Sequence, residues 1–130
     1  MHAFRKAVEA KDINAAVELL AEDVTFRSPA VFTPYRGKAA VATLLHAVFH
    51  VFEDFRYTRE IGAEDARDHA LVFEARVGDK SVEGCDFLHL NEDGLIDDFA
   101  VMIRPLKGLL ALAEAMQAQL TGIAEHPHTH

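Results

Sequence analysis

The sequence predicts an α+β fold, in which helices come first, antiparallel strands follow, and one helix ends the chain. Apolar residues recur at helical spacing up to about residue 52 and again after about residue 105. Between them the apolar residues alternate as in half-buried strands, and two turns rich in Gly, Asp and Asn interrupt this stretch. Consecutive strands without intervening helices favour an antiparallel meander over a doubly wound sheet.

Two short helices and one strand are expected at the N-terminal end. Apolar spacing predicts the helices over residues 3–10 and 13–21. Asp12 separates them and suits an N-cap, because its carboxylate can accept hydrogen bonds from the free amides of the next turn. Residues 24–28 alternate as a strand, which Pro29 ends because proline lacks the amide that a sheet requires.

The rest of the chain is expected to contain a long helix, four strands and a closing helix. A loop over residues 29–37, rich in Pro and Gly, leads into the long helix, which has one broad apolar face. Asp79 and Lys80 mark the tip of the first hairpin. In chain order, the helix, the strands and the closing helix span residues 38–52, 55–61, 71–77, 82–90, 95–104 and 106–120.

Composition limits the classes of function. The 130 residues, half of them hydrophobic, predict one domain over residues 1–122 and a disordered polar tail over residues 123–130. The formal net charge of −8 disfavours a nucleic acid partner, since an acidic surface repels phosphates. No apolar run reaches the roughly 20 residues that span a bilayer, so we expect no membrane partner and a cytoplasmic location. The single cysteine, Cys85, excludes an intrachain disulfide and fits a reducing compartment.

The hairpin register places one carboxyl group among apolar side chains. With Asp79 and Lys80 at the tip, Phe73 pairs with Asp86, and the next turn pairs Asp86 with Phe99. Because side chains alternate between the faces of a sheet, Asp86 is then the one ionisable group of its hairpin on the inner face. The residues expected on that face are Leu71, Phe73, Ala75, Val77, Val82, Gly84, Asp86, Leu88, Leu90, Leu95, Asp97, Phe99, Val101 and Ile103.

Asp86 is the main candidate for chemistry. Burial disfavours the charged form of a carboxyl group and raises its pKa, which is typical of functional acids and bases. The alternative interpretation is a structural aspartate that accepts a hydrogen bond from a backbone amide or a buried hydroxyl group. The sequence leaves both open.

Other polar clusters have simpler interpretations. His46 and His50 are four residues apart on the long helix, so they form either half of a metal site, which lacks a third ligand, or an exposed helix edge. We expect no metal and no cofactor. The residues expected on the outer sheet face, in ion pairs or at a dimer interface, are Glu74, Arg76, Glu83, Cys85 and His89.

Five segments carry a family resemblance. They are Asp12-Ile13 after a short helix, the strand entry at residues 21–26, the loop with Gly37 at residues 35–41, the hairpin at residues 84–96, and residues 104–109. In order and spacing they resemble the nuclear transport factor 2-like superfamily, and its SnoaL-like members in particular. The resemblance implies a cone, that is, a curved antiparallel sheet wrapped around helices with an inner apolar pocket, and a homodimer through the outer face of the sheet.

The ketosteroid isomerases of this superfamily share only part of their pattern with the chain. Asp86 matches their protonated aspartate, which is the known example of a neutral carboxyl group in catalysis. Ser28 stands where they have the general-base aspartate, and Phe4 stands where they have a hydrogen-bonding tyrosine. Serine is too weak a base to take a proton from carbon unaided, so a competent ketosteroid isomerase is not expected.

The predicted function is that of a small-molecule pocket protein. A largely apolar ligand with a carbonyl group would meet Asp86 as acid, base or hydrogen-bond donor, in an isomerase-, cyclase- or dehydratase-like proton transfer. The alternatives are a non-catalytic ligand-binding protein and a dimerisation module. The residues expected to contact the ligand are Ser28, Val41, Leu45, Phe49, Phe73, Phe99, Val101 and Ile103.

Overall fold

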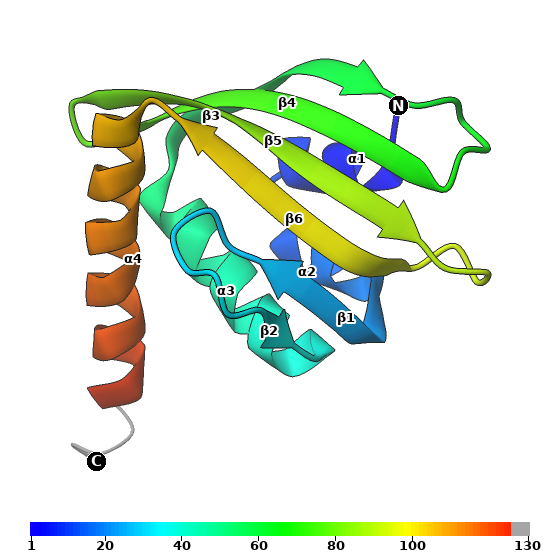
Figure 1. Cartoon of the computed structure of the whole chain (residues 1–130), viewed down its shortest axis with the longest axis horizontal. Coiled ribbons are helices and arrows are strands. Elements are labelled where there is room, and N and C mark those ends of the chain that lie inside the picture. Colours follow the sequence, from blue (N-terminus) through cyan, green and yellow to red (C-terminus); the bar gives the residue numbers. More distant parts are fainter. Residues whose placement is uncertain (126–130) are drawn as a thin grey trace.

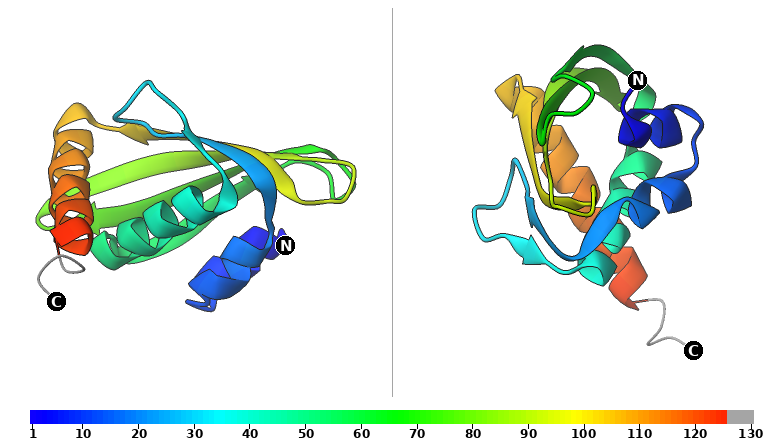
Figure 2. Two further views of the ribbon diagram at one scale, coloured as in Figure 1. Left: turned by 90° about the horizontal axis from the view of Figure 1, so that it is seen from below. Right: turned by 90° about the vertical axis from the view of Figure 1, so that its right-hand side faces the viewer.

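The computed structural model describes residues 1–125, which form helices and one curved sheet in the predicted α+β order (Figure 1). The helices are α1 (Ala3–Glu9), α2 (Ile13–Glu18), α3 (Lys38–Val51) and α4 (Leu106–Glu125). The strands are β1 (Leu20–Arg27), β2 (Tyr35–Arg36), β3 (Glu53–Ile61), β4 (Asp68–Val77), β5 (Lys80–Leu90) and β6 (Ile96–Arg104). The sheet curves around α3, and α4 stands across one end of the cone, where β6 finishes (Figure 2).

The sheet is mixed, which corrects the expectation of antiparallel strands throughout. The strand order is β2-β1-β6-β5-β4-β3. β1 pairs with β6 in parallel, and all other neighbours are antiparallel. The hairpin pattern predicts direction only for strands that a turn joins, and β1 and β6 are joined by most of the chain.

Both predicted hairpin registers were wrong by two residues. Gly78 and Asp79 form the first tip, so Asp86 pairs with Leu71 on β4 and with Val101 on β6. Because a shift of two residues is one full period of a strand, side chains in the regularly paired stretches keep their predicted face, and Asp86 lies on the inner one.

The start of β6 departs from that rule. A register shift follows His89, and Leu90 pairs with Ile96. The shift places Ile96 in the core in place of the expected Leu95.

Several element boundaries differ from the sequence prediction. Asp12 caps α2 as expected, since its Oδ1 accepts from the amide of Ala15 at 3.0 Å. α2 ends early because β1 already begins at Leu20, and the expected loop contains the two-residue strand β2. α4 continues through residues 123–125, which were expected to belong to the disordered tail, and residues 126–130 lie outside the described part of the chain. Within the described residues, no helix is both long and apolar enough to cross a membrane.

Two glycines permit close packing around the sheet. A Cβ atom on Gly84 would collide with the ring of Phe73, which lies across this strand. A Cβ atom on Gly108 would come within 2.5 Å of a Val82 methyl group, so α4 sits directly on β5. The contact at Gly108 holds the helix that closes one side of the cavity described next.

Candidate functional site

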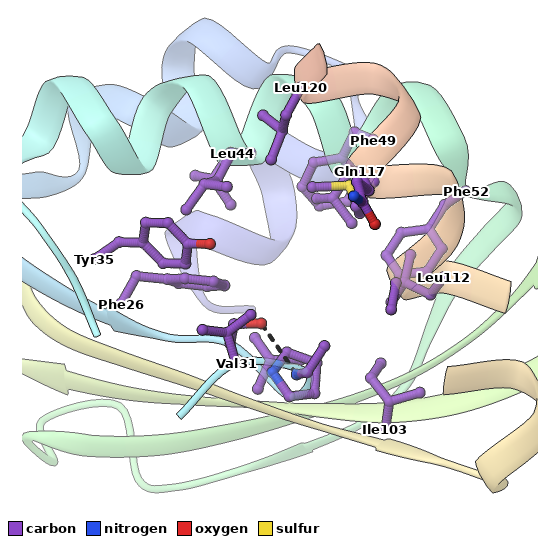
Figure 3. A pocket seen from close by; sticks show the side chains of 18 of the residues that line it. Phe26, Val31, Tyr35, Leu44, Phe49, Phe52, Ile103, Leu112, Gln117 and Leu120 are labelled. Carbon is purple, nitrogen blue, oxygen red and sulfur yellow. Dashed lines mark hydrogen bonds between the residues drawn. The ribbon is translucent and has the colours of Figure 1, made fainter. Parts of the chain in front are cut away.

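The cone contains a cavity of about 530 Å³ (Figure 3). Its walls are the inner face of the sheet, the C-terminal half of α3, the loop of residues 28–31 and one face of α4. Phe4 is buried beneath it against Phe99, with the ring centroids 5.2 Å apart, and Phe32 is fully exposed, so neither side chain fills the space. The volume lies within the range of roughly 300–1,000 Å³ that is typical of small-molecule sites.

Most of the residues that the sequence assigned to a ligand site meet at this cavity. These are Ser28, Leu45, Phe49, Asp86, Phe99, Val101 and Ile103. Val41 and Phe73 lie outside its lining and are fully buried. Val41 is on the N-terminal half of α3, and this helix packs on α2 and β1. Phe73 is covered by Phe55, whose ring stacks on it with the centroids 4.8 Å apart, so that Phe55 lines the cavity in place of Phe73.

Sequence reasoning missed 15 of the 22 described lining residues. The added residues come from β1, β2, α3 and its C-cap, β3, the proline-containing loop and α4, and they are Phe26, Pro29, Ala30, Val31, Tyr35, Leu44, Val48, Phe52, Phe55, Leu112, Ala113, Met116, Gln117, Leu120 and Thr121. The apolar stripe of α4 is visible in the sequence, but nothing in it indicates whether that stripe meets the core or a cavity.

The Asp86 carboxyl group has one hydrogen bond within the described chain. Its Oδ2 accepts from the hydroxyl group of Tyr57 at 2.9 Å. Tyr57 is on β3, two strands away in the sheet, and no local pattern along the chain indicates this pair. Only 4% of Asp86 is exposed, and among residues 1–125 its Oδ1 has no hydrogen-bond donor. Oδ1 is therefore the carboxyl oxygen available to a ligand.

Burial sets the protonation of this pair. Removal from water raises the pKa of Asp86 from 3.8 to about 7, and the hydrogen bond from Tyr57 opposes part of that rise. Burial, together with the neighbouring Asp86 carboxylate, raises the pKa of Tyr57 well above its ordinary value. Tyr57 thus stays protonated and can donate to Oδ2 whether Asp86 is charged or neutral. When it does so, neutral Asp86 carries its proton on Oδ1.

Phe4, at the position where the ketosteroid isomerases have a tyrosine, has no hydroxyl group to offer Asp86. Phe4 is fully buried and meets Phe99 edge to face. Tyr57 meets Phe55 edge to face at 4.9 Å and supplies a hydroxyl group to Asp86 instead. The chain therefore keeps a hydrogen-bonded aspartate but draws the donor from β3.

The other polar groups of the lining are neutral. Ser28, Tyr35, Gln117 and Thr121 line the cavity, and the Oγ of Ser28 accepts from the amide of Ala30 at 3.1 Å. No Lys, Arg or His is among the described lining residues. A ligand carboxylate or phosphate would therefore be buried without a counterion, which is strongly unfavourable.

The remaining candidates lie outside the cavity. His46 and His50 are exposed on α3, and the described residues contain no cluster of three or more metal-ligating side chains. Burial raises the pKa of Cys85, so its thiol group is not activated. On the outer face, Nδ1 of His89 lies 2.8 Å from Oδ1 of Asp68.

The outer-face ion pairs form across strands, as expected, although with partners that were not named. Glu74 binds Arg56 on β3, and Glu83 binds Arg104 on β6. Arg76 binds Glu53 and Asp54, the first residues of β3. These pairs are partly or largely exposed and contribute little stability individually.

Comparison with known proteins places the chain in a family. The model of the SnoaL-like domain matches residues 1–99. The chain belongs to the SnoaL-like domain family. No curated protein matches it significantly.

Solved structures agree with this family. The steroid delta-isomerase from Pseudomonas aeruginosa is 39% identical, with a TM-score of 0.87 over 92% of this chain and 88% of that one. An uncharacterized protein with a cystatin-like fold from Silicibacter pomeroyi DSS-3 is also 39% identical, with a TM-score of 0.88 over 95% of this chain and 86% of that one. An NTF2-like protein from Cytophaga hutchinsonii shares the fold at 20% identity, with a TM-score of 0.59 over 79% of this chain and 85% of that one.

Proposed function

We propose that this SnoaL-like protein binds a largely apolar, carbonyl-bearing small molecule in its cavity, with Asp86 as the polar contact. The observation that carries the proposal is that the two oxygens of the Asp86 carboxyl group differ in their surroundings. Oδ2 accepts a hydrogen bond from Tyr57, whereas Oδ1 has no donor among the described residues and lies beside an apolar cavity of about 530 Å³. No basic side chain is among the described lining residues, which disfavours an anionic ligand, and the protonated form of Asp86 favours an uncharged one.

Neutral Asp86 would donate its Oδ1 proton in a hydrogen bond to the ligand carbonyl group. In a cavity that excludes water, such a bond is stronger than in solution and favours negative charge on the carbonyl oxygen. With a pKa of about 7, the same carboxyl group can release and regain a proton near neutral pH. An isomerase-, cyclase- or dehydratase-like proton transfer would use Asp86 as its acid/base group.

The similar protein from Pseudomonas aeruginosa is named a steroid delta-isomerase, which favours a flat, polycyclic ketone as the ligand class here. Asp86 is the one carboxyl group among the described lining residues. Ser28 occupies the position of the isomerase base and already accepts a backbone hydrogen bond. We therefore propose carbonyl binding through Asp86, without the two-aspartate mechanism.

Binding of a naphthyl methyl ketone tests this proposal. Its control is isopropenyl naphthalene, in which a methylene group replaces the carbonyl oxygen. By calorimetry at about pH 5, the ketone should bind roughly tenfold more tightly, since a hydrogen bond to a buried acid contributes about 1.5 kcal/mol. The preference should decline above about pH 7, where Asp86 ionises. Equal affinities at about pH 5 would contradict the proposal.

The variant Asp86→Asn is the matched protein control. Asparagine retains an N–H donor but does not ionise. The ketone preference should persist in this variant and lose its pH dependence.

Deuterium exchange at the ketone methyl group, followed by NMR, separates catalysis from binding. Exchange that wild-type protein accelerates and Asp86→Asn does not would establish proton transfer by Asp86. Tight binding without acceleration would favour the non-catalytic alternative.

We also propose that the chain forms a homodimer through the outer face of the sheet. Phe87 (42% exposed) and Met102 (65% exposed) project from this face beside the half-buried Cys85. Exposed apolar side chains gathered on one sheet face are typical of an interface. Sedimentation at micromolar concentration should give a dimer for wild type and a monomer for Phe87→Lys. A wild-type monomer would contradict the proposal.

A further inference from the structure

One phenylalanine in the loop between β1 and β2 is covered by nothing. The side chain of Phe32 is fully exposed, so its ring packs on no other part of the described chain. Burial of a phenylalanine ring changes an equilibrium constant by roughly tenfold or more. Phe32 therefore has apolar binding surface to offer to whatever covers it.

The residues that precede Phe32 place it at the mouth of the cavity. Pro29, Ala30 and Val31 line the cavity, and Val31 does so while it is 44% exposed. A side chain that meets both the cavity and the solvent lies at the rim, and Figure 3 shows Val31 among the side chains that surround the cavity. Because adjacent Cα atoms are about 3.8 Å apart, the backbone of Phe32 lies one residue beyond this rim.

The tip of the loop can change shape without breaking hydrogen bonds. Figure 2 shows the loop projecting from the rest of the molecule. No hydrogen bond joins residues 31–33 to another part of the described chain. Pro29 and Pro34 each fix one backbone torsion angle, so a rearrangement falls mainly on the residues between them. Loop motions take nanoseconds to microseconds, so a turn of the Phe32 ring need not slow the entry of a ligand.

Resting on the proposed function, we infer that Phe32 turns onto the bound ligand and covers its flat apolar part at the mouth of the cavity. An aromatic side chain packs on a flat ring system in an offset-stacked or edge-to-face arrangement. Phe32 is then a ligand-contact residue, although its ring is not part of the cavity lining. Asp86 would hold the carbonyl group, and Phe32 would select for the ring system attached to it.

Nuclear Overhauser effects in the complex test this contact in the wild-type protein. With the naphthyl methyl ketone at about pH 5, intermolecular effects should connect the naphthyl protons to the rings of both Phe49 and Phe32. Phe49 lines the cavity and reports binding itself. Phe87, which is partly exposed on the outer face of the sheet, is the control and should show no effect. The spectrum of Phe32→Leu, which lacks one set of ring signals, assigns those of Phe32.

The rate of ketone dissociation measures what the ring contributes. Phe32→Ser removes the ring, so the naphthyl methyl ketone should dissociate roughly five- to tenfold faster. Glu92→Ser is the matched control, because Glu92 is exposed in the turn between β5 and β6, at the far end of the sheet from α4 (Figure 1). Its dissociation rate should equal that of the wild type. Both variants should keep the wild-type midpoint of urea denaturation, since both side chains are exposed.

The outcomes separate this inference from the proposed function. Effects at Phe49 without effects at Phe32, or a dissociation rate that Phe32→Ser leaves unchanged, would overturn the inference while ketone binding stands. If the Phe32 signals instead shift when the protein concentration is raised without ketone, a second copy of the chain covers the ring, and the inference is overturned as well. If the ketone does not bind at all, the proposed function fails and the role of Phe32 fails with it.

Discussion

Replacement of Asp86 by asparagine should stabilise the protein, by an amount that depends on pH. Asparagine has nearly the same shape, and its carbonyl oxygen can accept from the Tyr57 hydroxyl group. The wild-type protein holds a carboxyl group in an apolar cavity, where burial raises its pKa from 3.8 to about 7. The variant has no charge to bury, so it avoids the free energy that this ionisation costs.

The two pKa values determine the size of the effect. Because the folded-state pKa lies above the unfolded one, the folded protein binds the proton more tightly, and stability falls as pH rises from 3.8 to about 7. The interval of about 3.2 pH units corresponds to roughly 4 kcal/mol at 1.36 kcal/mol per unit. Above about pH 7 the loss is constant. A domain of this size has about 5–15 kcal/mol of stability in total, so the gain should be large.

Urea denaturation of both proteins, from about pH 4 to about pH 8.5, measures this difference. The unfolding free energy of Asp86→Asn minus that of the wild type should be near its minimum at the acid end and rise by roughly 4 kcal/mol towards neutral pH. Asp23→Asn is the control, because Asp23 is exposed and has no side-chain partner among residues 1–125. A difference that does not change with pH would refute the assignment of Asp86 as a buried, titrating acid.

Three other predictions test the surroundings of Asp86. Tyr57→Phe removes the hydrogen bond that lowers the pKa of Asp86, so NMR titration of the carboxyl carbon should show a midpoint above the wild-type one, and a lower midpoint would contradict this. Ketone binding at about pH 8 should take up roughly 0.4 of a proton, because a roughly tenfold preference for neutral Asp86 raises its pKa by about one unit in the complex. Calorimetry in buffers of different ionisation enthalpy measures this uptake, and Asp86→Asn should take up none. Gly84→Ala should lower the unfolding free energy by about 1–3 kcal/mol in thermal denaturation, since its methyl group collides with the Phe73 ring.

The periodic spacing of apolar residues, and the positions of glycine and proline between the elements, explain why much of the fold was predictable. α3 was expected over residues 38–52 and spans Lys38–Val51, because its apolar face is broad and a glycine precedes it. The position of Asp86 on the inner face of the sheet was also predictable, although the predicted hairpin register was wrong. An error of two residues leaves a side chain on the same face, whereas an error of one would have placed it outside.

The partner of Asp86 could not be predicted in the same way. Tyr57 reaches it across β4, and no spacing along the chain encodes which β3 side chain will lie beside a given β5 residue. The register between β3 and β4 also contains two irregularities, each of which changes the alignment. The alternation pattern predicts the face of a residue, but contacts between non-adjacent strands depend on every register between them.

The glycine at position 84 links the packing of the sheet to the chemistry of the cavity. Because Gly84 has no side chain, the Phe73 ring can approach β5 closely, and Phe55 stacks on Phe73. Phe55 in turn meets Tyr57 edge to face, which orients the hydroxyl group towards Oδ2 of Asp86. The hydrogen bond that leaves Oδ1 free for a ligand thus depends on a stack of aromatic rings that only a glycine admits, two residues away from the acid on the same face of the same strand.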